Sequence, residues 1–319
     1  MAPNSLLKQY SDERAALVQG AVSRAAAIIL GRRRVLSGIR WRDDLIVTAA
    51  EAIGGAEQVD IQLDGDELEA RVIATDLTTD IAVLRVARGA TAGASAAAAA
   101  AGTDAATPAS LMAPPTGRLL RVGETIAVIG RTLRGPAAIW GTVQLAGPAW
   151  NSRRGGKIDQ RLELDVGFDP AFEGAAVIDT SGNIVAMAVP GPHHLVLGIP
   201  AATIEAVVAK VDQFGHLPKP YIGIRLQPLW LDDDTRTKLG RKSRAIAAVG
   251  GVDAGSPAAQ AHVELGDLLL TMDGEPAESV NGMARRIAST NPGQTVALEV
   301  LRGGKPLTIN VQIGERPRH

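Results

Sequence analysis

Hydrophobic and polar residues alternate in short runs over residues 25–86, which predicts β-strands. Turn-forming Gly and Asp residues stand between the runs, which read AAAIIL, VLSGIRW, DLIVTAA, QVDIQL, EARVIAT and DIAVLRV. The pattern returns after residue 117 as ETIAVIGR, IWGTVQLA, RLELDV, GAAVIDT, NIVAMAV and HLVLGI. Because no helical pattern separates the strands within either set, the sequence predicts a domain of two packed β-barrels over residues 25–212.

Three segments depart from this pattern. Residues 1–24 carry apolar residues at helical spacing, which predicts one or two short helices packed on the body or, alternatively, an arm for oligomerisation. Residues 87–117 are rich in Ala, Gly, Ser, Thr and Pro, which predicts a long loop between the barrels. A helix is expected over residues 201–211, where Ile204 and Val208 fall on one face.

A second, smaller domain is predicted at 221–316, after a Gly- and Pro-rich hinge at 213–220. Its expected strands read YIGIRLQP, AIAAVG, DLLLTMDG, TVALEVLR and PLTINVQIG, and its helix reads SVNGMARRIAS. A segment of about 100 residues is normal for a small domain. The predicted fold class is therefore mainly β, with a double barrel followed by a separate β-rich domain.

Composition narrows the possible functions. The chain has 33 basic and 34 acidic residues and a net charge of −1, so it lacks the positive field expected of a nucleic-acid-binding protein. It has no cysteine, which excludes disulfides, thiolate metal sites and a Cys nucleophile. No apolar run near Met1 is long enough for a membrane span, and no signal-peptide pattern is visible there. We therefore expect a cytoplasmic location.

The order and spacing of five motifs resemble the HtrA family, in which a trypsin-like double β-barrel precedes a PDZ domain. LSGIRWRDDLIVTAAE resembles the Ser-Gly turn and the strand end that bears the catalytic His, and DLTTDIAVLRV resembles the Asp motif. RVGETIAVIG resembles the first strand of the second barrel, AFEGAAVIDTSGNIVAM the nucleophile loop, and LGIP the closing segment. The resemblance covers roughly residues 16–316 and implies both the trypsin-like fold and a PDZ domain.

The sequence departs from the family pattern at the catalytic residues and in the nucleophile loop. The resemblance places Glu51 at the position of the catalytic His and Glu173 at that of the nucleophilic Ser, while Asp80 keeps the Asp position. In the nucleophile loop, Ala171 and Phe172 replace the first Gly and the Asn, and Ala replaces the Gly and the Pro that follow the Ser. The catalytic triad is thus degenerate at two of three positions.

Loss of both nucleophile and base removes the route to acyl transfer. A carboxylate at position 173 has no hydroxyl, and Glu51 lacks the imidazole that takes up the proton of the nucleophile in this template. His193 and His194, on the loop before the last strand, are the residues that a displaced triad would use, although two surface histidines are the simpler interpretation. We therefore expect no catalytic residue and no serine-protease activity.

The three carboxylates Glu51, Asp80 and Glu173 should converge if the fold is trypsin-like. Like charges at short distance need compensation, which leaves three alternatives. One carboxyl group is protonated, an arginine such as Arg34 or Arg40 neutralises them, or a hard cation binds. We expect an internal arginine or lysine, and no metal or other cofactor. A glycosidase-type carboxylate pair is a weaker alternative, because aromatics make up only 3% of the chain and no sugar-binding groove is indicated.

The second domain carries a candidate peptide site. The segment Tyr221-Ile222-Gly223-Ile224 resembles the carboxylate-binding loop of the family's PDZ domain, and the strand that follows can pair with a ligand backbone. On the later helix, Val280, Met283 and Ile287 share one face. They form either a wall of the peptide pocket or simply core, and we include Met283 and Ile287 among the peptide-binding residues.

The most economical hypothesis is a catalytically inactive HtrA-like pseudoprotease that binds or scaffolds proteins. The PDZ groove would take protein or peptide C-termini. The resemblance also implies a homo- or hetero-oligomer, which can include an active HtrA relative. The rival hypothesis is a hydrolase, either serine-protease-like or cation-dependent, that uses an atypical carboxylate site at Glu51, Asp80 and Glu173.

Overall fold

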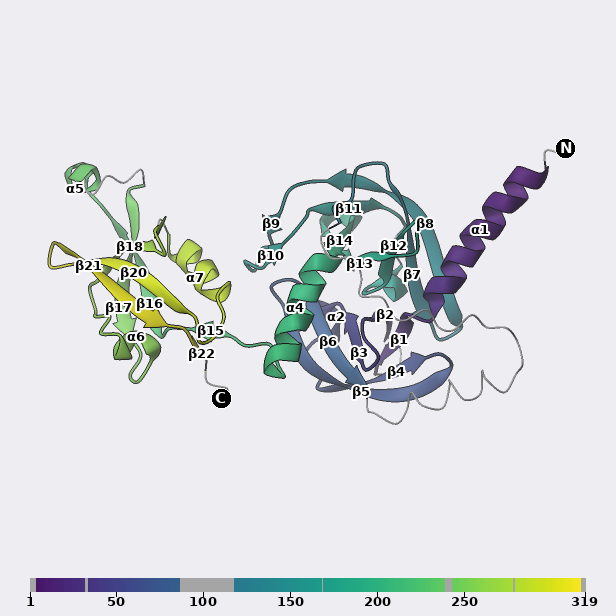
Figure 1. Ribbon diagram of the computed structural model, residues 1–319, viewed down its shortest axis with the longest axis horizontal. Helices are drawn as coiled ribbons and strands as arrows, with labels where there is room; N and C mark the ends of the chain where they lie inside the picture. Colours follow the sequence, from purple (N-terminus) through teal and green to yellow (C-terminus); the bar gives the residue numbers. More distant parts are fainter. Residues whose placement is uncertain are drawn as a thin grey trace. The chain divides into compact units, whose positions relative to one another are not determined.

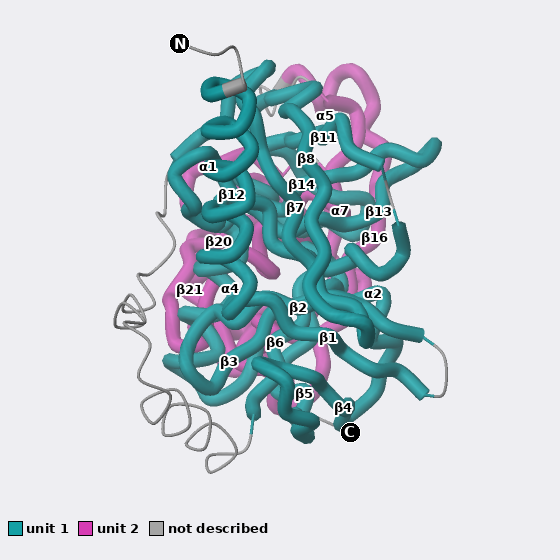
Figure 2. The backbone as a smooth tube through the Cα atoms, turned by 90° about the vertical axis from the view of Figure 1, so that its right-hand side faces the viewer, with its two compact units in different colours: residues 1–217 teal, residues 218–319 magenta. Residues whose placement is uncertain are grey.

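Two compact units make up the chain, residues 1–217 and residues 218–319 (Figure 2). The computed structural model describes residues 4–31, 34–86, 118–167, 169–238, 243–277 and 279–316. The division between the units falls inside the segment 213–220 that the sequence predicts as a hinge. The loop predicted at 87–117 lies outside the described residues.

The first barrel is closed by six strands in the order β1-β2-β3-β6-β5-β4 (Figure 1). These strands are β1 (Ala25–Leu30), β2 (Arg34–Arg40), β3 (Leu45–Thr48), β4 (Gln58–Leu63), β5 (Asp66–Asp76) and β6 (Ile81–Val86). Strand β3 is buried along its whole length. Gly38 in β2 makes room for close packing inside this barrel, because a Cβ there would lie 2.8 Å from side-chain atoms of both Ile28 and Ile46.

The second barrel is closed by six strands in the order β11-β14-β13-β12-β7-β8. They are β7 (Thr125–Thr132), β8 (Gly135–Ala146), β11 (Leu162–Asp165), β12 (Ala176–Asp179), β13 (Ile184–Pro190) and β14 (Val196–Pro200). A small hairpin of β9 (Trp150–Asn151) and β10 (Lys157–Ile158) projects from the connection between β8 and β11 (Figure 1). The predicted double barrel is confirmed.

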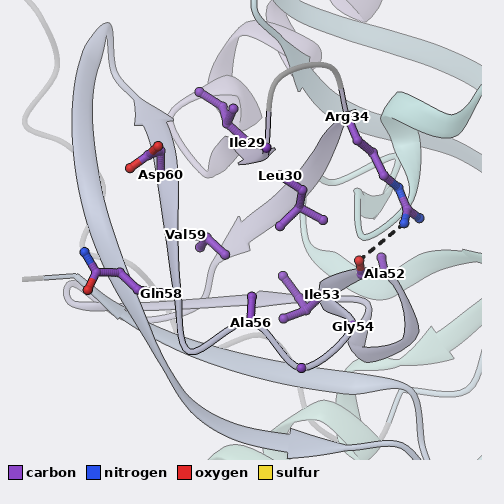
Figure 3. Close-up of a pocket in the computed structure, with 12 residues that line it drawn as sticks. Ile29, Leu30, Arg34, Ala52, Ile53, Gly54, Ala56, Gln58, Val59 and Asp60 are labelled. Atoms are coloured by element: carbon purple, nitrogen blue, oxygen red, sulfur yellow. Dashed lines mark hydrogen bonds between the residues drawn. The ribbon is translucent and has the colours of Figure 1, made fainter.

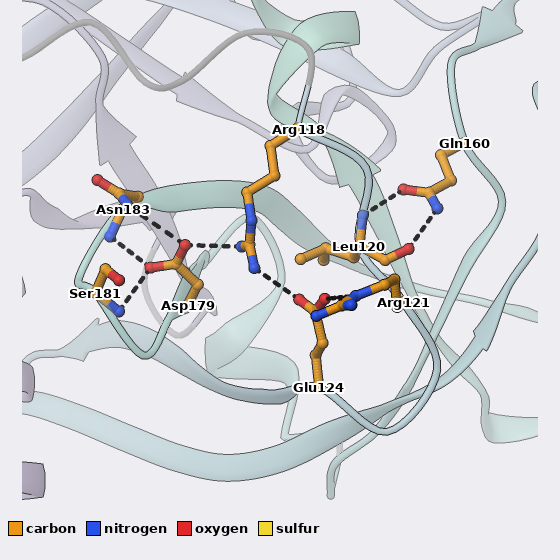
Figure 4. Close-up of polar contacts among 8 residues, drawn as sticks. All are labelled: Arg118, Leu120, Arg121, Glu124, Gln160, Asp179, Ser181 and Asn183. Carbon is orange, nitrogen blue, oxygen red and sulfur yellow. Dashed lines mark hydrogen bonds and ion pairs between the residues drawn. The ribbon is translucent and has the colours of Figure 1, made fainter.

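An ion-pair network lies where the chain enters the second barrel (Figure 4). Arg118 donates to Asp179, at 2.7 Å, and to Glu124, at 2.8 Å. The Asp179 carboxylate also accepts from the backbone N–H groups of Ser181 and Asn183, which close the turn between β12 and β13. Because the Asp179 side chain is only 7% exposed, these donors satisfy a carboxylate that water barely reaches.

In the described part of the first unit, two long helices accompany the barrels. Helix α1 (Asn4–Val22) is a single helix rather than two; Leu17, Val18 and Ala21 near its end pack on the core, whereas Leu6, Leu7 and Tyr10 are exposed. Helix α4 (Ala201–Phe214) packs against β5 and β6 of the first barrel and β13 and β14 of the second. A Glu205 carboxylate on α4 accepts the indole N–H of Trp41 at 2.7 Å, which attaches the helix to the first barrel.

The second unit is a small sheet covered by helices. Its strands run in the order β16-β17-β18-β20-β21, so β16 is an edge strand. The bounds are β16 (Ile224–Trp230), β17 (Ala245–Val252), β18 (Leu268–Met272), β20 (Thr295–Arg302) and β21 (Lys305–Gln312), with short β15 (Pro220–Tyr221), β19 (Glu275–Pro276) and β22 (Gly314–Glu315). The helices are α5 (Asp233–Lys238), α6 (Pro257–Gln260) and α7 (Val280–Ala288).

Candidate functional site

Glu51 lies where the buried strand β3 gives way to a single helical turn. This turn, α2 (Ala50–Ile53), ends at Gly54, whose φ of +61° closes it in the left-handed conformation. The loop between β5 and β6 brings Asp80 against its start. The Ala50 N–H donates to the Asp80 carbonyl at 3.3 Å, and the Glu51 N–H donates to Asp80 Oδ1 at 2.7 Å. The trypsin-like topology therefore places these two acidic residues side by side.

Asp80 occupies an unusual backbone conformation and an unfavourable electrostatic environment. Its φ of +58° lies in the left-handed region, which costs energy for a residue with a Cβ. Burial raises the pKa of its carboxyl group to about 6; the Glu51 N–H opposes the rise, and the charges of Glu51 and Glu173 add to it. The charges of all three carboxylates therefore act on one another, although burial is the main cause of the raised pKa of Asp80.

Glu173 ends the 3-10 turn η1 (Pro170–Phe172), which follows the end of β11. Its carbonyl accepts the Ser37 N–H at 3.0 Å, so the loop is joined to strand β2 of the other barrel. The next residue, Gly174, has a φ of +83°, and a Cβ there would lie 2.4 Å from the Ser37 carbonyl oxygen. This backbone path carries the Glu173 side chain into the junction between the two barrels.

Each of the two glutamates pairs with an arginine from the opposite barrel. Arg34 at the start of β2 donates to Glu173 Oε2 at 3.0 Å, and Arg154 on the β9–β10 hairpin donates to Glu51 Oε1 at 2.6 Å. The Glu173 side chain is only 9% exposed, whereas those of Glu51 and Arg154 are 58% and 50% exposed. The residues at the family's catalytic positions therefore form two reciprocal ion pairs across the barrel interface.

The loop that would bind an oxyanion uses its donors internally. In the trypsin-like template, backbone N–H groups at the nucleophile and two residues before it stabilise the developing charge. Here the N–H of Ala171 donates to Asp169 Oδ1 at 2.8 Å, and that of Glu173 donates to the Pro170 carbonyl at 3.2 Å. Both donors are therefore engaged in hydrogen bonds within the loop itself.

The arginine partners were predicted only in part. Arg34 is one of the two candidates, and it does meet Glu173. The prediction that Arg40 neutralises the carboxylates is wrong, because Arg40 lies at the far end of β2 and pairs with Asp64 at 3.3 Å. Arg154 was missed. It lies in an irregular hairpin held against the first barrel by a 2.5 Å hydrogen bond from Ser152 Oγ to the Thr78 carbonyl.

His193 and His194 lie on the short turn η2 (Pro192–His194), exposed and with φ angles of +56° and +61°. Within the described residues, neither forms a hydrogen bond or ion pair with Glu51, Asp80 or Glu173. This placement favours the interpretation of two surface histidines.

An open pocket of about 670 Å³ lies in the first barrel beside the Arg34–Glu173 pair (Figure 3). Leu30, Ile53 and Val59 converge on its centre, and the Arg34 side chain reaches along one side and donates to the Ala52 carbonyl at 3.4 Å. Arg34 therefore contacts both this pocket and the junction that holds Glu173.

In the second unit, the predicted carboxylate loop lies between β15 and the edge strand β16. The loop carbonyls are occupied: the Ile222 oxygen accepts the Ala258 N–H and the Gly223 oxygen accepts the Asp253 N–H, both at 2.8 Å. For the N–H groups of Ile222 and Gly223, no acceptor is found among the described residues. Gly223 has a φ of +79°, which a side chain would strain.

Helix α7 presents its apolar residues to the sheet. Met283 is 1% exposed and lies fully inside the core of the second unit. Val280 and Ile287 are partly exposed and pack against the same core. Of the two predicted wall residues, Ile287 keeps a surface that a ligand can reach, whereas Met283 has the buried position of a core residue.

Two other kinds of site have no candidate within the described segments. No cluster of three or more His, Cys, Asp or Glu side chains there is arranged to hold a metal ion. No helix in that part of the chain is long and apolar enough to cross a membrane.

Comparison with known proteins agrees with this architecture. Residues 36–187 match the family described as "Trypsin-like peptidase domain", and residues 220–313 match the family "PDZ domain". The chain is thus a trypsin-like domain joined to a PDZ domain. This domain order confirms the resemblance to the HtrA family that the sequence motifs indicate.

The similar proteins are named as proteases. The chain is 30% identical over 287 residues to a probable periplasmic serine endoprotease DegP-like of Bartonella henselae, covering 86% of this chain and 52% of that protein. It is 27% identical over 278 residues to the periplasmic pH-dependent serine endoprotease DegQ of Escherichia coli, covering 84% of this chain and 56% of DegQ. The chain therefore spans about half the length of these curated relatives.

Solved structures share the fold over most of the chain. The HtrA-type protease AlgW with a decapeptide has a TM-score of 0.66 at 21% identity, covering 96% of this chain and 99% of that one. A serine endoprotease from Yersinia pestis has a TM-score of 0.65 at 24% identity, covering 95% and 98%.

The prediction of a cytoplasmic location is wrong, because these curated relatives are named as periplasmic proteins. The prediction rested on the pattern near Met1 alone. Two folded barrels and a PDZ domain pack in the same way in either compartment, so their sequence carries no further information on location.

Proposed function

We propose that this chain is a catalytically inactive HtrA-type protein that binds partner proteins in the periplasm. The observation that carries the proposal is the state of the two positions where the family has its base and nucleophile. Glu51 and Glu173 lack the imidazole and the hydroxyl that acyl transfer needs, and each is paired with an arginine. The occupied N–H groups of Ala171 and Glu173 add a third deficit, in oxyanion stabilisation.

The binding function is assigned to the PDZ groove. The N–H groups of Ile222 and Gly223 are available for a terminal carboxylate, and β16 offers an open edge on which an extended peptide can pair. The proposed ligand is a protein C-terminus that ends in an apolar residue. Its apolar side chain would pack near Ile224 and Ile287, which are both partly exposed at the margin of the core.

Oligomer formation is part of the proposal. The first turns of α1 expose Leu6, Leu7 and Tyr10, with exposed fractions of 74%, 74% and 56%. Such a helix end gains stability if another subunit covers it, because burial of apolar surface contributes about 25 cal/mol per Å². The partner subunit is either another copy of this chain or an active HtrA relative.

Two assays on the purified chain test these assignments. Unfolded casein and a fluorophosphonate probe, each with and without EDTA, should show no cleavage and no labelling, while DegQ serves as the positive control. EDTA-sensitive cleavage by this chain would instead support the rival cation-dependent hydrolase. In the binding assay, a peptide with a free apolar C-terminus should bind in the micromolar range, about −8 kcal/mol, and its amide should lose most of that affinity.

A further inference from the structure

The edge strand β16 has features that determine how far a bound peptide can pair with it. This inference rests on the proposed PDZ function, in which the ligand carboxylate meets the loop before Ile224. Because that loop precedes β16, the ligand must run antiparallel to the strand, with its last residue beside Ile224 and earlier residues toward Trp230. The side chains along β16 therefore face successive positions of the ligand.

Alternate residues of β16 share one face. Ile224 and Leu226 pack on the core of the unit, while Arg225 and Gln227 are exposed on the other side. The irregularity in the β16–β17 pairing leaves this alternation intact, because the extra residue, Gly250, belongs to β17. Pro228 and Trp230 thus continue the face of Ile224 and Leu226, and Leu229 lies on the opposite face.

Pro228 ends the possible hydrogen-bond ladder. A proline has no N–H, and within an edge strand its nitrogen faces the unpaired side. Every second residue of β16 directs its N–H toward the ligand, so the N–H groups of Ile224 and Leu226 should be followed by one at position 228. Pro228 has no N–H to donate there. A peptide can pair with β16 along Ile224–Gln227, about four residues, and further affinity has to come from side chains.

The side chain of Trp230 is placed to supply this further affinity. Its side chain is 74% exposed, although its backbone is held in the sheet by pairing with Ala245. Residues opposite each other on paired strands carry their side chains on the same face. Since Trp230 follows Ile224 by six positions, the ligand residue about six positions before the C-terminus would lie over the indole.

We propose that Trp230 is a second specificity determinant of the PDZ groove, which binds an aromatic or long aliphatic residue about six positions upstream of the ligand C-terminus. The preferred partner is then a protein tail with two apolar anchors, one at its end and one at this upstream position. The residues between the anchors are bound mainly through their backbone.

The test uses the full chain and fluorescein-labelled peptides that end in the same apolar residue with a free carboxylate. One decapeptide carries Trp six positions before its last residue, and a second carries Gly there; a tetrapeptide with the same last four residues is too short to reach Trp230. Binding is measured by anisotropy to the unaltered chain, to Trp230→Ala and to the matched control Leu229→Ala, whose side chain faces the other way. Thermal melts establish that each variant is folded.

The unaltered chain should bind the Trp decapeptide roughly three- to tenfold more tightly than the Gly decapeptide, the range expected for an aromatic contact. Trp230→Ala should abolish that preference and leave tetrapeptide binding unchanged, whereas Leu229→Ala should retain it. If the tetrapeptide binds only with a free carboxylate, but the Trp and Gly decapeptides bind equally well, the proposed Trp230 contact is overturned. The proposed function would still stand in that case. Equal binding of free and amidated tetrapeptide would reject the carboxylate site and this inference together.

Discussion

Glu173 and Arg34 form an ion pair between the two barrels, with 3.0 Å between Arg34 Nη2 and Glu173 Oε2. Its two members differ in environment: the Glu173 side chain is 9% exposed and that of Arg34 is 53% exposed. A buried carboxylate depends on its partner more than an exposed guanidinium does, because only the carboxylate is cut off from water. This asymmetry determines how variants of the pair should behave.

Arg34→Ala should lower the free energy of unfolding by about 1–3 kcal/mol, because it leaves the Glu173 carboxylate buried without its cation. Glu173→Gln should change stability only slightly, and it should rescue most of the loss when combined with Arg34→Ala. Arg154→Ala is the matched control. It breaks an exposed pair, which contributes about 0–1 kcal/mol. Urea denaturation of the four variants measures these differences, and equal effects of Arg34→Ala and Arg154→Ala would contradict the asymmetry.

Glu51 and Glu173 themselves should not be needed for stability. The combined Glu51→Gln and Glu173→Gln variant removes two negative charges near Asp80, so we expect no loss of thermal stability at neutral pH. Because both glutamates have arginine partners, millimolar Ca²⁺, Mg²⁺ or Mn²⁺ should not shift the melting temperature. A cation that bound the carboxylates would stabilise the folded chain by about 2.7 kcal/mol at a hundredfold excess over its dissociation constant. A rise of several degrees that Glu173→Gln abolishes would establish such a site.

The raised pKa of Asp80 predicts a pH-dependent stability. Burial and the charges of Glu51 and Glu173 raise that pKa from 3.8 to about 6, so between pH 4 and 6 the folded chain binds a proton that the unfolded chain does not. This group therefore stabilises the fold at low pH, and its contribution is lost as the pH rises through 6. At about 1.4 kcal/mol per pKa unit, the change is at most about 3 kcal/mol.

Asp80→Asn isolates that contribution from those of other groups. An amide keeps an oxygen to accept the Glu51 N–H and tolerates the left-handed backbone, but it carries no charge. The variant should be more stable than the unaltered chain by about 1–3 kcal/mol at pH 7.5, and the two should be equal near pH 4. Thermal melts at several pH values give the difference. A constant difference across this range would show that Asp80 does not titrate as described.

The architecture could be predicted because local sequence patterns identify the strands of the trypsin-like fold and their order. Alternating apolar residues mark the strands, and buried β3 ends at Thr48, three residues before Glu51, so the site position follows from strand order. Arg34 could be predicted as a partner of the carboxylates, since it begins the strand that carries the Ser-Gly turn. Arg40 stands six residues further along β2, roughly 20 Å away at 3.3 Å per residue, which explains why it meets Asp64 instead.

Other features depend on tertiary contacts that no pattern encodes. Arg154 lies in the irregular hairpin after β8, and it reaches Glu51 because the path of the hairpin places it against the first barrel. Met283 falls on the apolar face of α7, but periodicity cannot tell a core position from a pocket wall. The internal hydrogen bond of the Ala171 N–H likewise depends on the conformation of the loop around Asp169.

Gly223→Ala should disable the carboxylate loop of the PDZ domain. A Cβ at position 223 would lie 2.1 Å from the Ser256 Cβ, and the φ of +79° is unfavourable for alanine. The loop would have to shift, which would misplace the N–H groups of Ile222 and Gly223. Affinity for a free C-terminal peptide should fall at least tenfold, while the amidated peptide should bind as weakly as before. Gly255→Ala is the control, since its φ of +70° imposes similar strain but no atom lies within 4 Å of the added Cβ.

Restoring the catalytic side chains alone should not restore activity. Glu51→His with Glu173→Ser supplies the base and the nucleophile beside Asp80, but the N–H groups of Ala171 and Glu173 remain bonded to Asp169 and the Pro170 carbonyl. Loss of an oxyanion donor costs about 10²–10³ in turnover. We therefore expect casein cleavage by the double variant to stay near background. Asp169→Ala, added to it, should raise the rate by freeing the Ala171 N–H, whereas full activity of the double variant would show that the loop rearranges on its own.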